Sequence, residues 1–276
     1  MDIATIIGLG FGLFLVFFGM SEPGSFTPPE TFFNLRGLAI VLGGTLAATL
    51  VNYPLKNVVG MLKVSLQAFL SSGSNNHMEI INEMAEYSEQ SRKKGLPSLE
   101  NILDGIDNHF LQMGLENAIL EKDSKKLENF LDSELNSMID RHSNGQEIFY
   151  NMGSYAPAFG LLGTVMGLIL MMTRQAATSS VDSYAAGAQD SMSALLQGMG
   201  IALVTTFYGV LLANLLFIPI AGKLKARSDE EVHSLNIIKA GILSIHSKEH
   251  PLIMREKLLT FVDKDTRKAA RQSTPT

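Results

Sequence analysis

The 276-residue sequence contains no cysteine and no tryptophan. The absence of cysteine excludes disulfide bonds and thiolate metal sites. The absence of tryptophan leaves tyrosine and phenylalanine as the aromatic residues that anchor helices at a membrane surface. Candidates for that role are Phe32, Phe33, Tyr53 and Tyr150.

Charged side chains are also missing from four long stretches of the chain. These stretches hold no aspartate, glutamate, lysine or arginine, and they cover residues 3–21, 37–55, 148–173 and 191–222. A bilayer core about 30 Å thick needs roughly 20 mostly apolar helical residues. The sequence therefore predicts an all-α, polytopic membrane protein with four transmembrane helices and a helical cytoplasmic domain.

The first apolar stretch has the length of a signal peptide as well as that of a membrane helix. A signal peptide begins with basic residues, but only Asp2 precedes this stretch. The sequence "FFGM" at its end is a poor cleavage site for signal peptidase. We interpret it as a retained transmembrane helix.

The basic residues predict the orientation of the chain. Of the 22 lysines and arginines, 9 lie in 53–147, 11 lie from Pro219 to the end, and the others are Arg36 and Arg174. The positive-inside rule then places both termini and both large polar segments in the cytoplasm. Only the short segments 22–35 and 174–190 are expected outside. The expected organisation is transmembrane helices 1 and 2 in 1–52, a cytoplasmic helical domain in 53–147, transmembrane helices 3 and 4 in 148–222, and a cytoplasmic tail in 223–276.

The middle segment has the spacing of amphipathic helices. One helix is predicted to begin at Asp123 or Ser124, because the apolar residues that follow share one helical face. Those residues are Leu127, Phe130, Leu131, Leu135, Met138 and Ile139. A second helix is predicted over about 76–94. It should end near Gly95, because Pro97 disfavours helical backbone at the residue before it.

A charged cluster surrounds this predicted helix end. Arg92, Lys93 and Lys94 close the helix, and Glu100 is expected to open the next one. Cations at a helix C-terminus and an acid at a helix N-terminus are favoured by the helix dipole, so the cluster has a purely structural explanation. The middle segment carries 15 acids against 9 bases and the tail 7 against 11, which does not favour nucleic-acid binding.

None of the four stretches has a titratable side chain at mid-depth, and intramembrane ion pathways normally use such groups. The chain alone therefore cannot relay protons. It does offer hydroxyl oxygens at Thr164, Thr205 and Thr206. Membrane threonines often bond their own helix backbone, but hydroxyl oxygens also suit a hard cation. We treat the three as ion-pathway candidates.

Small residues and prolines mark the third and fourth stretches. Gly163 and Gly167 form a G-x-x-x-G pair that Gly160 extends, and such residues let membrane helices approach closely. Pro157 and Pro219 lie at the predicted cytoplasmic ends of these stretches. Each removes one helix hydrogen bond and permits a bend.

The order and spacing of several motifs resemble a known family, the MotA/PomA subunits of the bacterial flagellar stator. The resemblance covers nearly the whole chain. It is carried by "MDIATIIGL", "VLGGT", "SRKKGLPSLE", "DRHSNGQEIF", "APAFGLLGTVMGLI", "TTFYGVLLANLLFIPIAGKL" and "IIKAGILSI".

This resemblance implies an inner-membrane stator subunit with roles in motility and chemotaxis and no cofactor. It implies five copies around two single-span MotB/PomB-type partners, whose aspartate accepts the transported Na+ or H+. By the same resemblance, Arg92 and Glu100, with Lys93 and Lys94, face the rotor switch protein. Pro157 and Pro219 match prolines implicated in coupling ion passage to movement, again by resemblance.

The resemblance also bears on the choice of ion. Sodium-type members have threonines like those in "GTVMGL" and "TTFYG", which favours sodium over protons. One departure is that some sodium-type relatives have an aspartate where this chain has Asn34, with Arg36 two residues later.

Two other functions are left open by the sequence. One is an ion-driven energy transducer of the TolQ/ExbB type, which shares the last two membrane helices. The other is a membrane enzyme, for which we find no nucleophile, base and orienting group at suitable spacing. The histidines lie outside the four stretches without a metal-ligand pattern and are expected to be surface or packing residues: His77, His109, His142, His233, His246 and His250.

Overall fold

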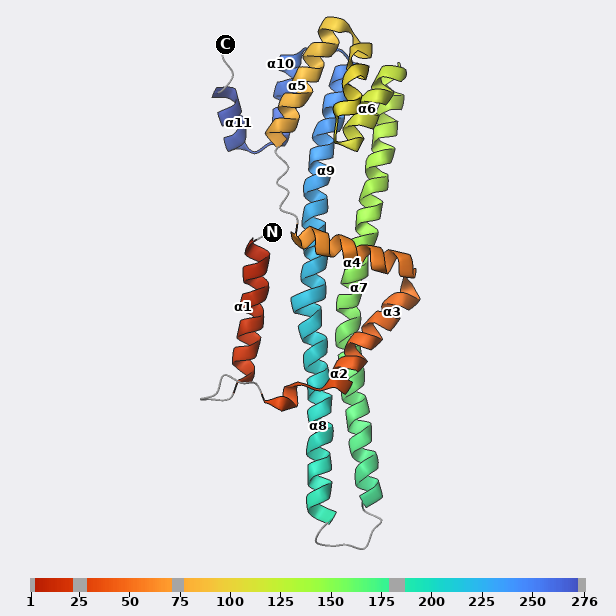
Figure 1. Cartoon of the computed structure of the whole chain (residues 1–276), viewed down its shortest axis with the longest axis vertical. Helices are drawn as coiled ribbons and strands as arrows, with labels where there is room; N and C mark the ends of the chain where they lie inside the picture. Colours follow the sequence, from red (N-terminus) through yellow and green to blue (C-terminus); the bar gives the residue numbers. More distant parts are fainter. Residues whose placement is uncertain (1–2, 22–28, 71–76, 179–186, 273–276) are drawn as a thin grey trace. The chain divides into compact units, whose positions relative to one another are not determined.

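The computed structural model describes residues 3–21, 29–70, 77–178 and 187–272, and every regular element in these ranges is a helix (Figure 1). The predicted outer segments 22–35 and 174–190 fall partly outside the described residues. The α-helices are α1 (Ile3–Met20), α2 (Leu35–Leu38), α3 (Gly44–Asn52), α4 (Leu55–Leu70), α5 (His77–Lys94), α6 (His109–Leu120), α7 (Ser124–Thr178), α8 (Gly187–Leu212), α9 (Ile218–His246), α10 (Pro251–Leu258) and α11 (Lys264–Gln272). The 3-10 helices are η1 (Glu30–Phe32), η3 (Leu96–Gly105) and η5 (Leu259–Phe261), and the π-helices are η2 (Ala39–Gly43) and η4 (Ala213–Phe217).

The predicted fold class is confirmed. Four helical segments are long and apolar enough to cross a membrane, and they lie in Ile3–Met20, Leu35–Asn52, Ser124–Thr173 and Gly198–His246. The chain is an all-α protein with four transmembrane helices.

The described residues form two compact units. The first unit comprises residues 1–72 and 143–225, and the second comprises 73–142 and 226–276. The helix α4 groups with the first unit, although it lies in the segment 53–147 that was expected to be one domain. The expected boundary at residue 147 falls inside α7, which runs without a break from Ser124 to Thr178.

In the first unit, α1, α7 and α8 run roughly parallel, while α4 runs across them (Figure 1). A proline sets the direction of α4. Pro54 restricts Tyr53 to extended backbone, with φ −128° and ψ 145°, so α3 ends there and α4 starts in a new direction. The core of this unit comes mainly from η2, α7 and η4: Val41, Ile148, Phe149, Met152, Ala156, Ala213, Phe217 and Ala221.

Two pairs of polar side chains tie α3 to α7 near this turn. The Asn151 amide donates to the Tyr53 hydroxyl at 2.5 Å, and the Asn52 amide donates to the Tyr155 hydroxyl at 3.3 Å. The predicted anchor Tyr53 is therefore also a packing residue. Tyr150 remains exposed and is free to face the membrane surface.

The second unit packs α5, η3, α6 and α10 with the first part of α7 and the last part of α9. As predicted, α5 ends before Gly95, whose φ of +87° is one that glycine adopts without strain. The predicted start of α7 is also confirmed, because the Asp123 carboxylate accepts from the Lys125 amide. The Lys239 ammonium donates to Asp132 at 2.5 Å and joins α9 to α7.

Candidate functional site

The helices α7 and α8 lie against each other through glycine. A β-carbon added at Gly160 would lie 2.9 Å from the Thr205 carbonyl oxygen, and one added at Gly163 would lie 2.6 Å from the Thr205 β-carbon. One added at Gly167 would lie 3.0 Å from the β-carbon of Ala202. Across the pair, a β-carbon at Gly209 would lie 2.6 Å from a carbonyl oxygen of α7. These contacts place all three predicted packing glycines on the α8 side of α7, at distances that leave no room for a side chain.

Two of the three predicted ion-pathway threonines lie together. The Thr164 hydroxyl oxygen on α7 is 2.5 Å from the Thr206 hydroxyl oxygen on α8 and 3.0 Å from the Ala202 carbonyl oxygen. It is also 3.2 Å from the Gly160 carbonyl oxygen in its own helix. The Thr206 side chain is exposed and Thr164 is half-buried. The two hydroxyls therefore form one polar spot on an open side of the α7–α8 pair.

The third threonine lies elsewhere. Thr205 is fully buried between the helices, its side chain packs on Gly163, and its hydroxyl donates to the Ala202 carbonyl oxygen at 2.8 Å. Adjacent residues of a helix point about 100° apart, so Thr205 and Thr206 necessarily face different surroundings. The sequence grouped the three residues, but their side chains have different positions.

Both predicted hinge prolines lie at irregular points in the helices of the first unit. Pro157 stands inside α7, and its α-carbon would be 3.1 Å from a β-carbon at Gly209. Pro219 is the second residue of α9, directly after the π-helix η4. A proline cannot bond the carbonyl four residues earlier, and a π-turn is one of the ways a helix accommodates that loss.

The charged cluster in the second unit forms an exposed corner between α5 and η3. Arg92, Lys93, Lys94 and Glu100 are all exposed. Lys93 forms an ion pair with Glu89 at 2.6 Å, and this hydrogen bond lowers the pKa of the Glu89 carboxyl.

The expectation that Glu100 opens a helix was wrong. It lies in the middle of η3, whose first turn contains Pro97 instead. Proline suits the first turn of a helix because its missing N–H would have no partner there. The corner is fixed from inside by Leu99, which is fully buried, and by a 3.1 Å hydrogen bond from the Gln90 amide to the Ser98 carbonyl oxygen.

Sequence reasoning missed Tyr208 of α8. Its hydroxyl donates to the Phe32 carbonyl oxygen and accepts from the Asn34 amide at 3.0 Å, so it joins α8 to the start of α2. The Asn34 side chain in turn caps α2 by accepting from the Gly37 amide. The available signal was a tyrosine inside an apolar stretch, because a phenol in that position requires polar partners.

Three of the histidines predicted to be packing residues bond within the second unit. His142 bonds the Ser228 hydroxyl, His233 the Phe261 carbonyl oxygen and His246 the Glu121 carbonyl oxygen, each at 2.8–3.0 Å. Over the described ranges, no three histidine, aspartate or glutamate side chains gather in a way that could hold a metal ion.

Comparison with known proteins agrees with this architecture. The family model described as the MotA/TolQ/ExbB proton channel family matches residues 102–237. Motility protein A of Treponema pallidum is 34% identical over 268 residues, which cover 97% of this chain and 96% of the relative. The chain belongs to the MotA/TolQ/ExbB family. Members of this family are ion channel subunits and not enzymes.

Two solved structures share the fold. The structure of the flagellar MotAB stator complex from Bacillus subtilis matches with a TM-score of 0.78 and 26% identity, covering 98% of both chains. The structure of C. jejuni MotAB matches with a TM-score of 0.82 and 24% identity, covering 96% of this chain and 97% of the other. The resemblance to MotA/PomA subunits that the motifs indicated is thereby confirmed.

Proposed function

We propose that the chain is the channel subunit of a flagellar stator, which converts an ion-motive force into torque on the rotor. One observation carries the proposal. The helices α7 and α8 supply a glycine-packed pair with the Thr164 and Thr206 hydroxyls on one side, but the four apolar stretches contain no acid or base. An ion path built on such helices needs a carboxylate from another chain.

That carboxylate is proposed to come from a single-span partner of the MotB/PomB type. The titles of the two matching structures name a MotAB complex, which supports such a partner. Five copies of this chain around two partners is the assembly that the family resemblance favours. We infer that the partner's aspartate takes up the ion beside the α7–α8 pair.

Sodium is the ion favoured by the proposal. The Thr164–Thr206 spot offers two neutral oxygens, and oxygen ligands suit a hard cation that has lost part of its hydration shell. A proton path needs titratable groups and would rely on the partner's aspartate alone. The buried Thr205 is proposed to act by packing only.

Torque transfer is proposed to involve the prolines and the exposed corner of the second unit. Pro157 and Pro219 stand where the helix hydrogen-bond pattern is interrupted, so bending there costs less than elsewhere. Arg92, Lys93 and Glu100 would then contact the rotor switch protein. The chain is proposed to lie in the bacterial inner membrane with both termini in the cytoplasm, which the uneven distribution of lysine and arginine supports.

Motility of the organism that encodes the chain tests the proposal. Deletion of the gene should leave assembled but paralysed flagella, and the gene in trans should restore swimming. Swimming cells after deletion, in an organism with no second stator set, would contradict it. Normal swimming with a defect in outer-membrane processes would instead favour the TolQ/ExbB type of function.

The ion is tested separately, by swimming speed against external sodium at fixed pH. Speed should rise with sodium and survive an uncoupler that collapses the proton gradient. Speed that ignores sodium and falls with the uncoupler would reject sodium while leaving the stator function intact.

The exposed corner is tested by charge reversal. Arg92→Glu should reduce torque without lowering protein level, since exposed substitutions usually change stability by less than about 0.5 kcal/mol. Lys125→Glu, an exposed charge reversal on α7, is the matched control. Equal loss of motility in both variants would count against a specific contact at the corner.

A further inference from the structure

The helix α4 has an apolar face that the rest of the described chain does not cover. Leu55, Val59 and Leu62 are 65%, 45% and 47% exposed. Their offsets of 0, 4 and 7 place them on one stripe of the helix. Its opposite flank is held by the protein, because Val58 and Ser65 are buried and Met61 packs on the core of the first unit.

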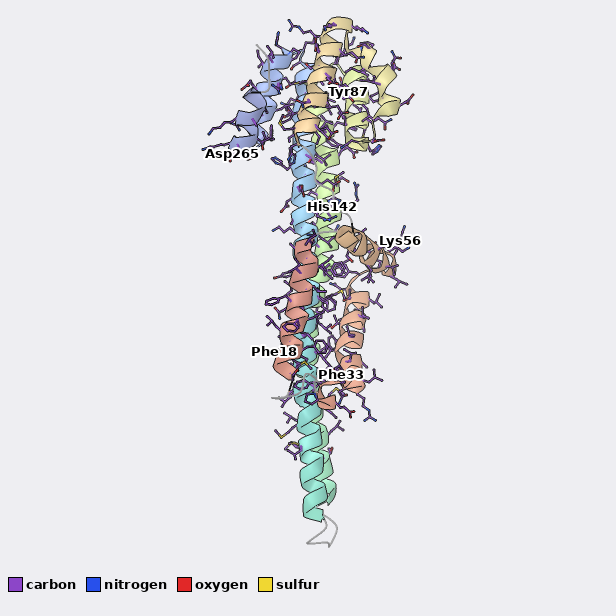
Figure 2. All side chains as sticks on the ribbon, turned by 60° about the vertical axis from the view of Figure 1, so that its left-hand side comes forward. Phe18, Phe33, Lys56, Tyr87, His142 and Asp265 are labelled. Atoms are coloured by element: carbon purple, nitrogen blue, oxygen red, sulfur yellow. The ribbon has the colours of Figure 1, made fainter. Side chains whose placement is uncertain are left out.

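The charges of α4 are all of one sign. The segment Leu55–Leu70 contains Lys56 and Lys63 and no acid. These lysines are seven residues apart, so they lie on the same side of the helix about 10 Å from each other, next to the apolar stripe. Both are exposed, and within the described ranges neither ammonium group has an ion-pair or hydrogen-bond partner. Figure 2 shows Lys56 on α4, which stands out from the long helices of the first unit.

The position of α4 indicates what faces this surface. It follows directly on the span that ends at Asn52 and runs across α1, α7 and α8, which cross the membrane (Figure 1). A helix in that direction at the end of a span lies along the bilayer surface. An amphipathic helix with an apolar stripe and flanking lysines is the type that binds at the interface of an anionic membrane.

We propose that α4 binds acidic phospholipid of the bilayer, with the stripe of Leu55, Val59 and Leu62 in the acyl boundary and the Lys56 and Lys63 ammonium groups on the phosphates. Charge complementarity carries the choice of ligand, since an uncompensated lysine near an anionic leaflet strengthens binding by about fivefold. This inference goes beyond channel function and does not depend on which partner or ion the chain uses.

The absence of tryptophan provides a direct test. In the full-length protein, Leu62→Trp places a lone fluorescent reporter on the stripe, and Val64→Trp places one on the opposite, exposed side of α4. Each protein is reconstituted in bilayers that contain the same small mole fraction of either brominated phosphatidylglycerol or brominated phosphatidylcholine. Bromine quenches tryptophan only at short range.

The Leu62→Trp reporter should be quenched by both lipids, and up to about fivefold more effectively by the glycerol lipid. Adding Lys56→Gln and Lys63→Gln should bring that ratio to about one while quenching by the choline lipid persists, which shows that α4 remains in the interface. High salt should have the same effect as the two substitutions. Val64→Trp should be quenched weakly by both lipids.

The matched control is Lys125→Gln with Lys126→Gln, which removes the same charge from exposed positions of the second unit. It should leave the lipid preference unchanged. Equal quenching by the two lipids in the parent reporter would overturn the proposed headgroup binding. Failure of both lipids to quench Leu62→Trp would show that protein, such as a second copy of the chain, covers the stripe, and would overturn the proposal altogether.

Discussion

The hydroxyl oxygens of Thr164 and Thr206 lie 2.5 Å apart, although the two residues belong to different helices and are 42 positions apart in the chain. At this distance one hydroxyl donates to the other. Thr164 also lies within reach of the Ala202 carbonyl oxygen, so it can donate there and accept from Thr206. The pair thus presents oxygen lone pairs at the surface of the two packed helices.

Replacing Thr164 or Thr206 with valine should weaken the response of swimming speed to sodium, because valine keeps the shape and removes the oxygen. Thr205→Val removes only a buried hydrogen bond to Ala202, so it should lower stability by about 1 kcal/mol and leave the ion dependence unchanged. The measurement is speed against external sodium at fixed pH. A stronger effect on sodium dependence from Thr205→Val than from the other two would reject the assignment of the pathway to the exposed pair.

Replacing Gly163 with alanine should destabilise the α7–α8 pair. The new methyl group would lie 2.6 Å from the Thr205 β-carbon, which is close to the backbone and cannot rotate away. Overpacking of this kind costs about 1–3 kcal/mol. The free energy of unfolding in mixed micelles provides the measurement.

Two further variants control this experiment. Gly200→Ala meets nothing within 4 Å and should not destabilise the pair. Thr205→Ala combined with Gly163→Ala should recover part of the lost stability, because it removes the atoms that clash. A double variant as unstable as the sum of the single ones would show that the two positions do not interact.

Replacing Tyr208 with phenylalanine should loosen the link between α8 and α2. The change leaves the Asn34 amide and the Phe32 carbonyl without their phenol partner, at a cost of about 1–3 kcal/mol. Thermal unfolding of the detergent-solubilised protein should therefore begin at a lower temperature. Tyr150→Phe, at an exposed position, should leave the unfolding temperature unchanged.

Tyr87 makes the stability of the second unit depend on pH at the alkaline end. Burial, together with a 2.5 Å hydrogen bond to the Glu83 carboxylate, raises the pKa of the Tyr87 phenol above its usual value of 10.0. A raised pKa means that the folded state holds the proton more tightly than the unfolded state does. The resulting stabilisation is complete below about pH 10 and is lost as pH rises toward the folded value.

The ultraviolet absorbance of phenolate should therefore show Tyr87 ionising later than an ordinary tyrosine. The difference between the titrations of the parent protein and Tyr87→Phe isolates this residue from the other five tyrosines. Loss of a transition near pH 10, in place of a later one, would contradict the predicted shift.

Much of the fold could be predicted because local chemistry decides it. The apolar stretches specify four membrane helices, Gly95 and Pro97 end α5, and Asp123 caps α7. The unbroken course of α7 through residue 147 was not predicted, since the polarity of the sequence changes there but its preference for helix does not. The π-helices η2 and η4 have no clear sequence signal and depend on packing with neighbouring helices.

The candidate site was predicted only as a set of residue types. The sequence identified three threonines, but which of Thr205 and Thr206 points between the helices depends on the rotation of α8 against α7. That rotation is determined by contacts such as Gly163 with Thr205, between residues 42 positions apart. Tyr208 was missed for the same reason, because its partners Phe32 and Asn34 lie far away in the chain.

The π-helix before Pro219 has a consequence for how this span tolerates changes of length. A π-turn contains one residue more than an α-helical turn, so deleting a single residue from Ala213–Phe217 would restore α-helical bonding without breaking the span. The same deletion would turn the residues from Ile218 onward by about 100° relative to α8. A one-residue gap here should therefore preserve the membrane helix and change only which of its sides faces each neighbour.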